Sequence, residues 1–235
     1  MGRVVVFPNS KGGSGKTTAA FILATELAQR GLDVTVIDAD PNHPIDKWRK
    51  GGGKASSLTI KTNDNENTIM TDIDAAREDS DFVIVDLEGS ANLSVGYAVS
   101  LADLVIVPSQ RSTLDATEAA KTVVLVKNQS RIAKRNIPVA LLLTRTNAAI
   151  RPKGLQRMLS NLESSHIEAF TTEIYEREAF KAMFDYVCTI AQLKDSQVGG
   201  LDKARANAAD FAAEVIRKLQ KEQGTKEKSV LESIA

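Results

Sequence analysis

The stretch Val4-Val-Val-Phe7-Pro-Asn-Ser-Lys11-Gly-Gly-Ser-Gly-Lys-Thr-Thr18 decides the fold of this chain. Its apolar start predicts a buried strand, and a helical pattern that ends at Gly31 follows its glycine-rich end. A glycine-rich loop between a strand and a helix can turn several backbone N–H groups toward one anion, and the helix dipole adds positive potential there. The stretch therefore predicts a phosphate-binding loop.

The side chains of this loop have separate expected roles. Lys16 is expected to reach the β and γ phosphates of a nucleotide, and the Thr17 hydroxyl to ligate Mg²⁺ held between them. Where the general motif has its first glycine the chain has Ser10, and an extra lysine, Lys11, follows it. This is the deviant form of the Walker A motif. The loop residues expected to bind the nucleotide are Gly12, Gly13, Ser14, Gly15, Lys16, Thr17 and Thr18.

Short apolar runs alternate with helical patterns along the rest of the chain. With 235 residues, 43% of them hydrophobic, the chain can bury a sizeable core as one domain. The pattern predicts an α/β fold of the P-loop NTPase class, a mostly parallel twisted sheet flanked by helices on both faces. Residues 1–222 are expected to form the domain, and 223–235 a frayed tail. The expected strands are 4–7, 34–37, 82–85, 104–107 and 139–143; the expected helices are 16–29, 68–77, 91–100, 115–135, 152–162 and an apolar-faced helix from about 204 to 219.

Composition narrows the function classes. Thirty basic residues balance thirty acidic ones, so any affinity for nucleic acid must come from local clustering. Cys188 is the only cysteine, which excludes an intrachain disulfide. No apolar run approaches the ~20 residues that span a bilayer, and no signal-peptide pattern is present, so a cytoplasmic location is expected. His43 and His166 lack metal-ligand spacing and are expected at the polar surface.

Acidic residues follow two of the expected strands. In a parallel sheet the ligand lies beyond the carboxyl ends of the strands. Asp86 ends an apolar strand in the manner of a Walker B carboxylate, which holds Mg²⁺ through water, and Gly89 follows in a segment that resembles a switch. Asp38 and Asp40 close the second strand; one of them could accept a proton from the attacking water, or both could belong to an aspartate-proline turn.

The nucleotide base is indicated by elimination. Guanine-specific P-loop proteins place Asn-Lys-x-Asp after a late strand, whereas this chain has Thr144-Arg145-Thr146-Asn147 there. The aspartate that reads guanine is absent, so ATP is favoured.

Together these motifs resemble the ParA/MinD ATPases, and most closely the small plasmid-partition ATPases of the ParF type. The resemblance covers roughly residues 3 to 220. It implies that ATP joins two subunits face to face and that Lys11 crosses to the partner's nucleotide. It also implies that Asp40 positions the attacking water, with Asp38 structural, and that Thr144 and Arg145 lie at the adenine. A ParB-like partner that stimulates weak hydrolysis, and association with the nucleoid, are further implications.

A basic stretch of the chain suggests a surface for binding DNA. Between Lys121 and Leu162 the chain has nine basic residues and no Asp or Glu. Such a surface suits nonspecific DNA binding, although it could be a solvated helix whose charges are offset by acidic neighbours in space. The preferred DNA contacts are Arg151, Lys153 and Arg157, and a second set in the last helix includes Lys203 and Arg205.

Two other functions stay open. A positioning ATPase of the MinD kind would bring a membrane or protein cargo, but the last helix lacks the basic amphipathic character that membrane binding needs, so no membrane partner is expected. A biosynthetic kinase would use the same loop with a small-molecule acceptor. Trp48, which follows the Asp40 segment, is expected to be a packed anchor rather than a stacking platform.

Overall fold

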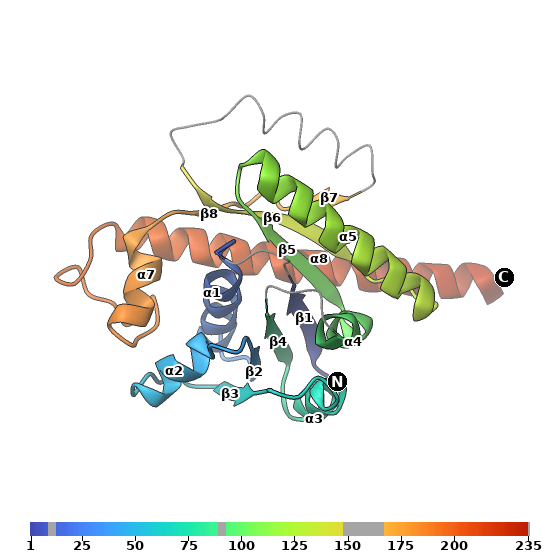
Figure 1. Ribbon diagram of the computed structural model, residues 1–235, viewed down its shortest axis with the longest axis horizontal. Coiled ribbons are helices and arrows are strands. Elements are labelled where there is room, and N and C mark those ends of the chain that lie inside the picture. The colour runs from blue at the N-terminus through green and yellow to red at the C-terminus, as the bar shows by residue number, and fades with distance from the viewer. Residues whose placement is uncertain (9–12, 89–92, 148–166, 235) are drawn as a thin grey trace.

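The computed structural model of the chain describes residues 1–8, 13–88, 93–147 and 167–234 (Figure 1). The strands that it describes form one sheet in the order β3-β2-β4-β1-β5-β6-β7, with β8 also paired to β6. Every one of these pairings is parallel. The strands are β1 (Arg3–Phe7), β2 (Val34–Ala39), β3 (Leu58–Thr62), β4 (Phe82–Leu87), β5 (Leu104–Ser109), β6 (Val139–Thr146), β7 (Glu168–Ala169) and β8 (Ile174–Tyr175).

Helices cover both faces of this sheet, as the sequence predicts (Figure 1). In β1, Val5 and Phe7 pack into one apolar core while Val4 and Val6 pack into the other. The alternation follows from the two-residue period of a strand, and it explains why a strand covered on both faces is apolar throughout. The described helices are α1 (Lys16–Gln29), α2 (Pro44–Lys50), α3 (Ile69–Asp79), α4 (Leu93–Leu101), α5 (Thr113–Ile132), α7 (Glu178–Asp185) and α8 (Leu201–Ile234).

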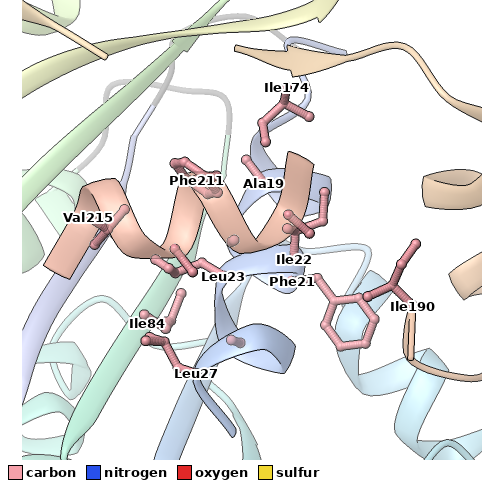
Figure 2. Packing of buried hydrophobic residues seen from close by; sticks show 14 of the residues in the cluster. Ala19, Phe21, Ile22, Leu23, Leu27, Ile84, Ile174, Ile190, Phe211 and Val215 are labelled. Carbon is pink, nitrogen blue, oxygen red and sulfur yellow. The ribbon is translucent and has the colours of Figure 1, made fainter. Parts of the chain in front are cut away.

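One core lies under α1, α2, α7 and α8, and the other under α3, α4 and α5. In the first core, Leu23 and Leu27 of α1 lie beside Ile84 of β4, with Phe211 and Val215 of α8 in the same layer (Figure 2). The buried face of α8 repeats every three to four residues, as its sequence pattern predicts. This layer holds α1, and therefore the phosphate loop before it, against the sheet.

The structure differs from the sequence interpretation in several elements. α8 continues to Ile234, past Gly224, where the sequence placed the end of the helix; whether its last turns fray stays a prediction. The sequence interpretation omitted α2, β3, β7, β8 and α7. Three of these, β8, α7 and α2, contribute to the site described next. The helix expected over 152–162 lies outside the described residues.

Candidate nucleotide-binding site

The phosphate loop turns into α1 through glycines in the left-handed region. Gly13 has φ 79° and Gly15, the N-cap of α1, has φ 84°. Side chains rarely adopt this backbone conformation. A Cβ at Gly15 would also lie 3.2 Å from the Cβ of Thr144, so this position combines a backbone and a steric requirement for glycine. Lys11 and Gly12 lie outside the described residues.

Side chains at the ends of β5 and β6 hold the carbonyl groups of the loop. The Gly13 carbonyl accepts hydrogen bonds from Gln110 Nε2 at 2.9 Å and Arg145 Nη1 at 3.2 Å. The Ser14 carbonyl accepts one from Thr144 Oγ1 at 2.6 Å. Thr144 and Arg145, assigned by sequence to the adenine, therefore support the loop directly. Sequence reasoning missed Gln110, which is 97 residues from Gly13 along the chain.

Lys16 and Asp40 meet at the mouth of this loop. Lys16, the first residue of α1, is buried, and its Nζ lies 3.9 Å from Oδ2 of Asp40, which directly follows β2. The surrounding pocket contains both the residues assigned to phosphate binding and the residue assigned to catalysis. Its described lining consists of Gly13, Ser14, Gly15, Lys16, Thr17, Thr18, Asp40, Asn42 and Arg145.

Asp86 lies at the end of β4 and is fully buried. Neither of its carboxylate oxygens has a hydrogen-bond partner among the described residues. Burial raises the pKa of Asp86 to about 7; nearby Lys16 and Thr17 oppose this shift, whereas Asp38 and Asp40 add to it. A buried carboxylate without donors is costly when ionised, and a hydrated cation would supply the missing charge and donors. Asp86 and the Thr17 hydroxyl thus fit the requirements of a Mg²⁺ site.

Asp38 has a structural role, in agreement with the sequence interpretation. Its Oδ2 accepts hydrogen bonds from the backbone N–H groups of Ile45 and Asp46, both at 2.9 Å, which satisfies donors in the first turn of α2. Burial raises the pKa of Asp38, and these hydrogen bonds oppose that shift. Because α2 starts just after Asp40, Asp38 fixes the segment that carries Asp40.

Trp48 anchors the other end of α2, as expected from the sequence. Its side chain is 3% exposed and lies 4.8 Å from the ring of Phe21, centroid to centroid. Its Nε1 donates to the Met183 carbonyl of α7 at 3.1 Å. His43, just before α2, is partly exposed and its Nε2 lies 2.6 Å from Oδ1 of the exposed Asp64, which agrees with the expected place at the polar surface.

A second hollow adjoins the phosphate pocket and shares Gly15, Thr18 and Arg145 with it. Its far wall comes from β8 and α7, where the Arg177 guanidinium lies over the Tyr175 ring at 5.2 Å. The planar guanidinium and ring, next to a phosphate loop, can bind a planar heterocycle by stacking. The described lining of this hollow is Gly15, Thr18, Thr144, Arg145, Ile174, Tyr175, Glu176, Arg177, Phe180 and Lys181.

The residues expected to contact DNA are only partly described. Arg151, Lys153 and Arg157 lie outside the described residues, as do Gly89 and His166. Lys203 is exposed on α8. Arg205, by contrast, donates to the carbonyl groups of Ile190, Ala191 and Leu193, so its guanidinium holds the segment before α8.

Several described basic residues of this stretch have partners within the chain. Lys121 Nζ lies 2.7 Å from Glu118 Oε1, one turn earlier on α5. Arg135 donates to the carbonyl groups of Ser100 and Ala102 at the end of α4. Arg145 binds the phosphate loop. These three cations therefore have structural partners: Lys121 pairs with a carboxylate, whereas Arg135 and Arg145 bind backbone carbonyl groups and keep their charge.

Neither a multi-ligand metal cluster nor a membrane-spanning helix occurs among the described residues. Among the described residues, no group of three or more His, Cys, Asp or Glu side chains is placed to hold a metal ion. This does not conflict with the Mg²⁺ site above, because such a site uses one carboxylate, a hydroxyl and phosphate oxygens. The described residues also include no helix that is long and apolar enough to cross a membrane.

A parallel sheet with a glycine-rich phosphate loop between β1 and α1, a loop lysine and an aspartate at the end of β4 defines a P-loop NTPase. Residues 2–214 match the family of VirC1 proteins. The chain is 35% identical to Protein ParA of Rhizobium radiobacter, over 92% of this chain and 97% of that protein. It therefore belongs to the VirC1/ParA family, a branch of the ParA/MinD ATPases. It is also 26% identical to the maintenance of carboxysome distribution protein A of Halothiobacillus neapolitanus, over 74% of this chain and 79% of that protein.

Solved structures share the fold. A variant of the Cyanothece protein McdA in complex with ATP matches with a TM-score of 0.72 at 16% identity, over 91% of this chain and 96% of that one. A putative plasmid partition protein of Borrelia burgdorferi bound to AMPPNP matches with a TM-score of 0.67 at 16% identity, over 93% of this chain and 100% of that one. At this identity the likeness concerns the fold.

Proposed function

We propose that this chain is a ParA-type ATPase that forms an ATP-dependent sandwich dimer, binds DNA nonspecifically and drives plasmid or chromosome partition with a ParB-like partner. The observation that carries the proposal is the convergence of Lys16, Asp40 and Asp86 around the phosphate loop. Similarity to ParA along nearly the whole chain supports the same conclusion.

The site supports a simple mechanism for converting ATP to ADP and phosphate. The loop N–H groups and Lys16 bind the β and γ phosphates, and Asp40 accepts a proton from the attacking water. Thr17, and Asp86 through water, would hold Mg²⁺, and the ion would supply positive charge to the phosphates. Titration of the full-length chain with a fluorescent ATP analogue tests this arrangement: Lys16→Ala should remove binding. Asp40→Ala should bind ATP but turn over slowly; unchanged turnover would remove Asp40 from the mechanism.

Dimerisation rests on Lys11, which lies outside the described residues. In the proposal Lys11 reaches the phosphates of the partner's nucleotide, so ATP occupancy and dimer formation become one event. Lys11→Ala should therefore retain ATP binding by the monomer but lose both the dimer and hydrolysis. Sedimentation with ATP, ADP or no nucleotide measures this, and a normal ATP-dependent dimer of the variant would contradict the role of Lys11.

The adenine is assigned to the hollow between the loop, β8 and α7. Support comes from its shared wall with the phosphate pocket and from the Arg177–Tyr175 pair. Thr144 and Arg145 then act at the boundary of base and phosphate. Tyr175→Ala should lower the affinity for ATP more than the affinity for inorganic triphosphate. Equal losses of the two affinities would place the base elsewhere.

DNA binding is assigned first to Arg151, Lys153 and Arg157, which belong to the stretch from Lys121 to Leu162 that has nine basic residues and no Asp or Glu. Replacing these three residues by alanine should weaken binding of arbitrary duplex DNA and flatten its salt dependence. Lys203→Ala tests the second set. ATP-dependent binding that is unchanged in the triple variant would contradict the assignment, whereas loss only in Lys203→Ala would move the DNA surface to α8. Association of a fluorescent fusion with the nucleoid is the expected cellular counterpart.

A second candidate is the positioning of a protein assembly rather than a DNA cargo. Sequence similarity to a carboxysome distribution protein favours this candidate. Both candidates predict an ATP-dependent dimer but differ in the partner that stimulates hydrolysis. Stimulation by a centromere-binding protein supports partition, and stimulation by a cargo-shell adaptor supports positioning. Turnover that needs a small-molecule acceptor would instead indicate a kinase.

A further inference from the structure

The turn after β2 contains a contact that the mechanism above does not use. Asn42 donates to Asp40 Oδ1 twice, from its backbone N at 2.9 Å and from its side-chain Nδ2 at 3.2 Å. The other oxygen of the same carboxylate, Oδ2, lies 3.9 Å from Lys16 Nζ. The two oxygens of Asp40 therefore have different partners: one faces its own turn, and the other faces the phosphate pocket.

The carboxylate of an aspartate rotates easily, because χ2 is a broad torsion. Two donors on a single oxygen restrict that rotation and leave the second oxygen in one direction. The backbone donor of Asn42 is common to any residue except proline, as in an ordinary Asx turn. The Nδ2 donor, in contrast, depends on the asparagine side chain. Asn42 is exposed and lines the phosphate pocket, so this contact adds to the site rather than to the core.

We propose that Asn42 is a positioning residue, whose side-chain amide holds Asp40 with Oδ2 directed into the phosphate pocket. In this orientation Oδ2 can accept the proton of the attacking water, and Oδ1 cannot. The inference rests on the role given to Asp40 in the proposed function. It adds a residue that binds no substrate itself and acts on turnover through Asp40.

The test measures single-turnover hydrolysis and ATP affinity of the full-length chain at saturating Mg²⁺. Asn42→Ala should lower kcat by about tenfold, the effect of one hydrogen bond to a charged group, with ATP affinity unchanged. Asn42→Ser, which keeps a short donor, should recover part of that loss. Asn67→Ala is the matched control, since Asn67 is exposed and its backbone N makes the same kind of turn contact with Asn65 Oδ1 at 3.0 Å, away from the site.

The double variant Asp40→Ala with Asn42→Ala separates this inference from the proposed function. If Asn42 acts through Asp40, the double variant hydrolyses no more slowly than Asp40→Ala alone, because coupled residues are not additive. A wild-type kcat for Asn42→Ala beside a slow Asp40→Ala would overturn the positioning role and leave Asp40 in place. A weaker ATP affinity with unchanged kcat would also overturn it, since Asn42 would then bind nucleotide. Normal turnover by Asp40→Ala alone would remove the proposed role of Asp40 itself.

Discussion

Replacing Asp86 by asparagine should make the nucleotide-free protein more resistant to alkaline pH. Asp86 is fully buried and without hydrogen-bond partners among the described residues, and burial raises the pKa of its carboxyl from the usual 3.8 to about 7. The protonated form is thus favoured in the folded state. The stability that this group contributes is fully present below pH 3.8 and is lost as pH rises through about 7.

The size of the effect follows from these two pKa values. Each pKa unit corresponds to about 1.4 kcal/mol, so the ionised group costs the folded protein about 4 kcal/mol at pH 8. Part of this cost is already present at pH 5, because the unfolded carboxyl is ionised there. Between pH 5 and pH 8 the wild-type protein should lose about 2 to 3 kcal/mol from Asp86 alone. An asparagine buries an amide at a cost that does not change with pH.

Urea unfolding at pH 5 and pH 8, in EDTA and without nucleotide, measures this difference. The wild type and Asp86→Asn share their other titrating groups, so the difference between their pH dependences reports on Asp86. Asp74→Asn, an exposed aspartate of α3, is the control and should follow the wild type. Parallel pH dependences for the wild type and Asp86→Asn would refute the assignment of a buried, unpaired carboxyl to Asp86.

Three further predictions concern the loop, α8 and α2. Gly15→Ala should lower the free energy of unfolding by about 1–2 kcal/mol because of the positive φ, and further because of the contact with Thr144. It should also weaken ATP binding. Gly31→Ala is the control: Gly31 has φ 81° with open space around its Cβ, so this variant should show only the backbone cost. Glu214 accepts three hydrogen bonds from Thr171 and Thr172; although burial raises its pKa, these bonds lower it below 4.5 overall. Glu214→Gln should therefore cost about 1–3 kcal/mol of unfolding free energy at pH 7, and its deficit should shrink as pH falls below about 4.5. Trp48→Phe removes the indole N–H donor and should lower the free energy of unfolding by about 1 kcal/mol. It should also lower kcat at saturating ATP. An unchanged kcat would limit Trp48 to packing.

The elements that the sequence predicts best are those with strong local patterns. The unbroken apolar runs of β1, β4 and β5 are buried on both faces, and the phosphate loop is contiguous in sequence. The strand β3 was missed because it is an edge strand of the described sheet with exposed Thr59 and Lys61. β7 and β8 have two residues each, too few for any period to be visible.

The candidate site also contains residues with a strong local pattern and residues without one. The expected roles of Lys16, Asp40 and Asp86 follow from motifs, and the fold places Lys16, at the start of α1, near the ends of the adjacent strands β2 and β4. Gln110 has no such pattern, because its only signal is a hydrogen bond to a carbonyl 97 residues away. Arg205 shows a second limit: its charge suggests DNA, and sequence gives no sign of its hydrogen bonds to backbone carbonyl groups before α8. Its role at DNA stays a prediction.

Helix α7 links the hollow proposed for the base to the helix that follows Asp40. Phe180 and Lys181 of α7 line the hollow next to the phosphate loop, and the Met183 carbonyl of the same helix accepts the Trp48 indole N–H. Trp48 is on α2, the helix that begins just after Asp40. Because packed interiors transmit displacement rather than absorb it, we expect a base that moves α7 to move α2 as well. The role of Trp48 is therefore decided by kcat as well as by stability. If Trp48 only packs, its replacement by phenylalanine lowers the free energy of unfolding and leaves kcat unchanged.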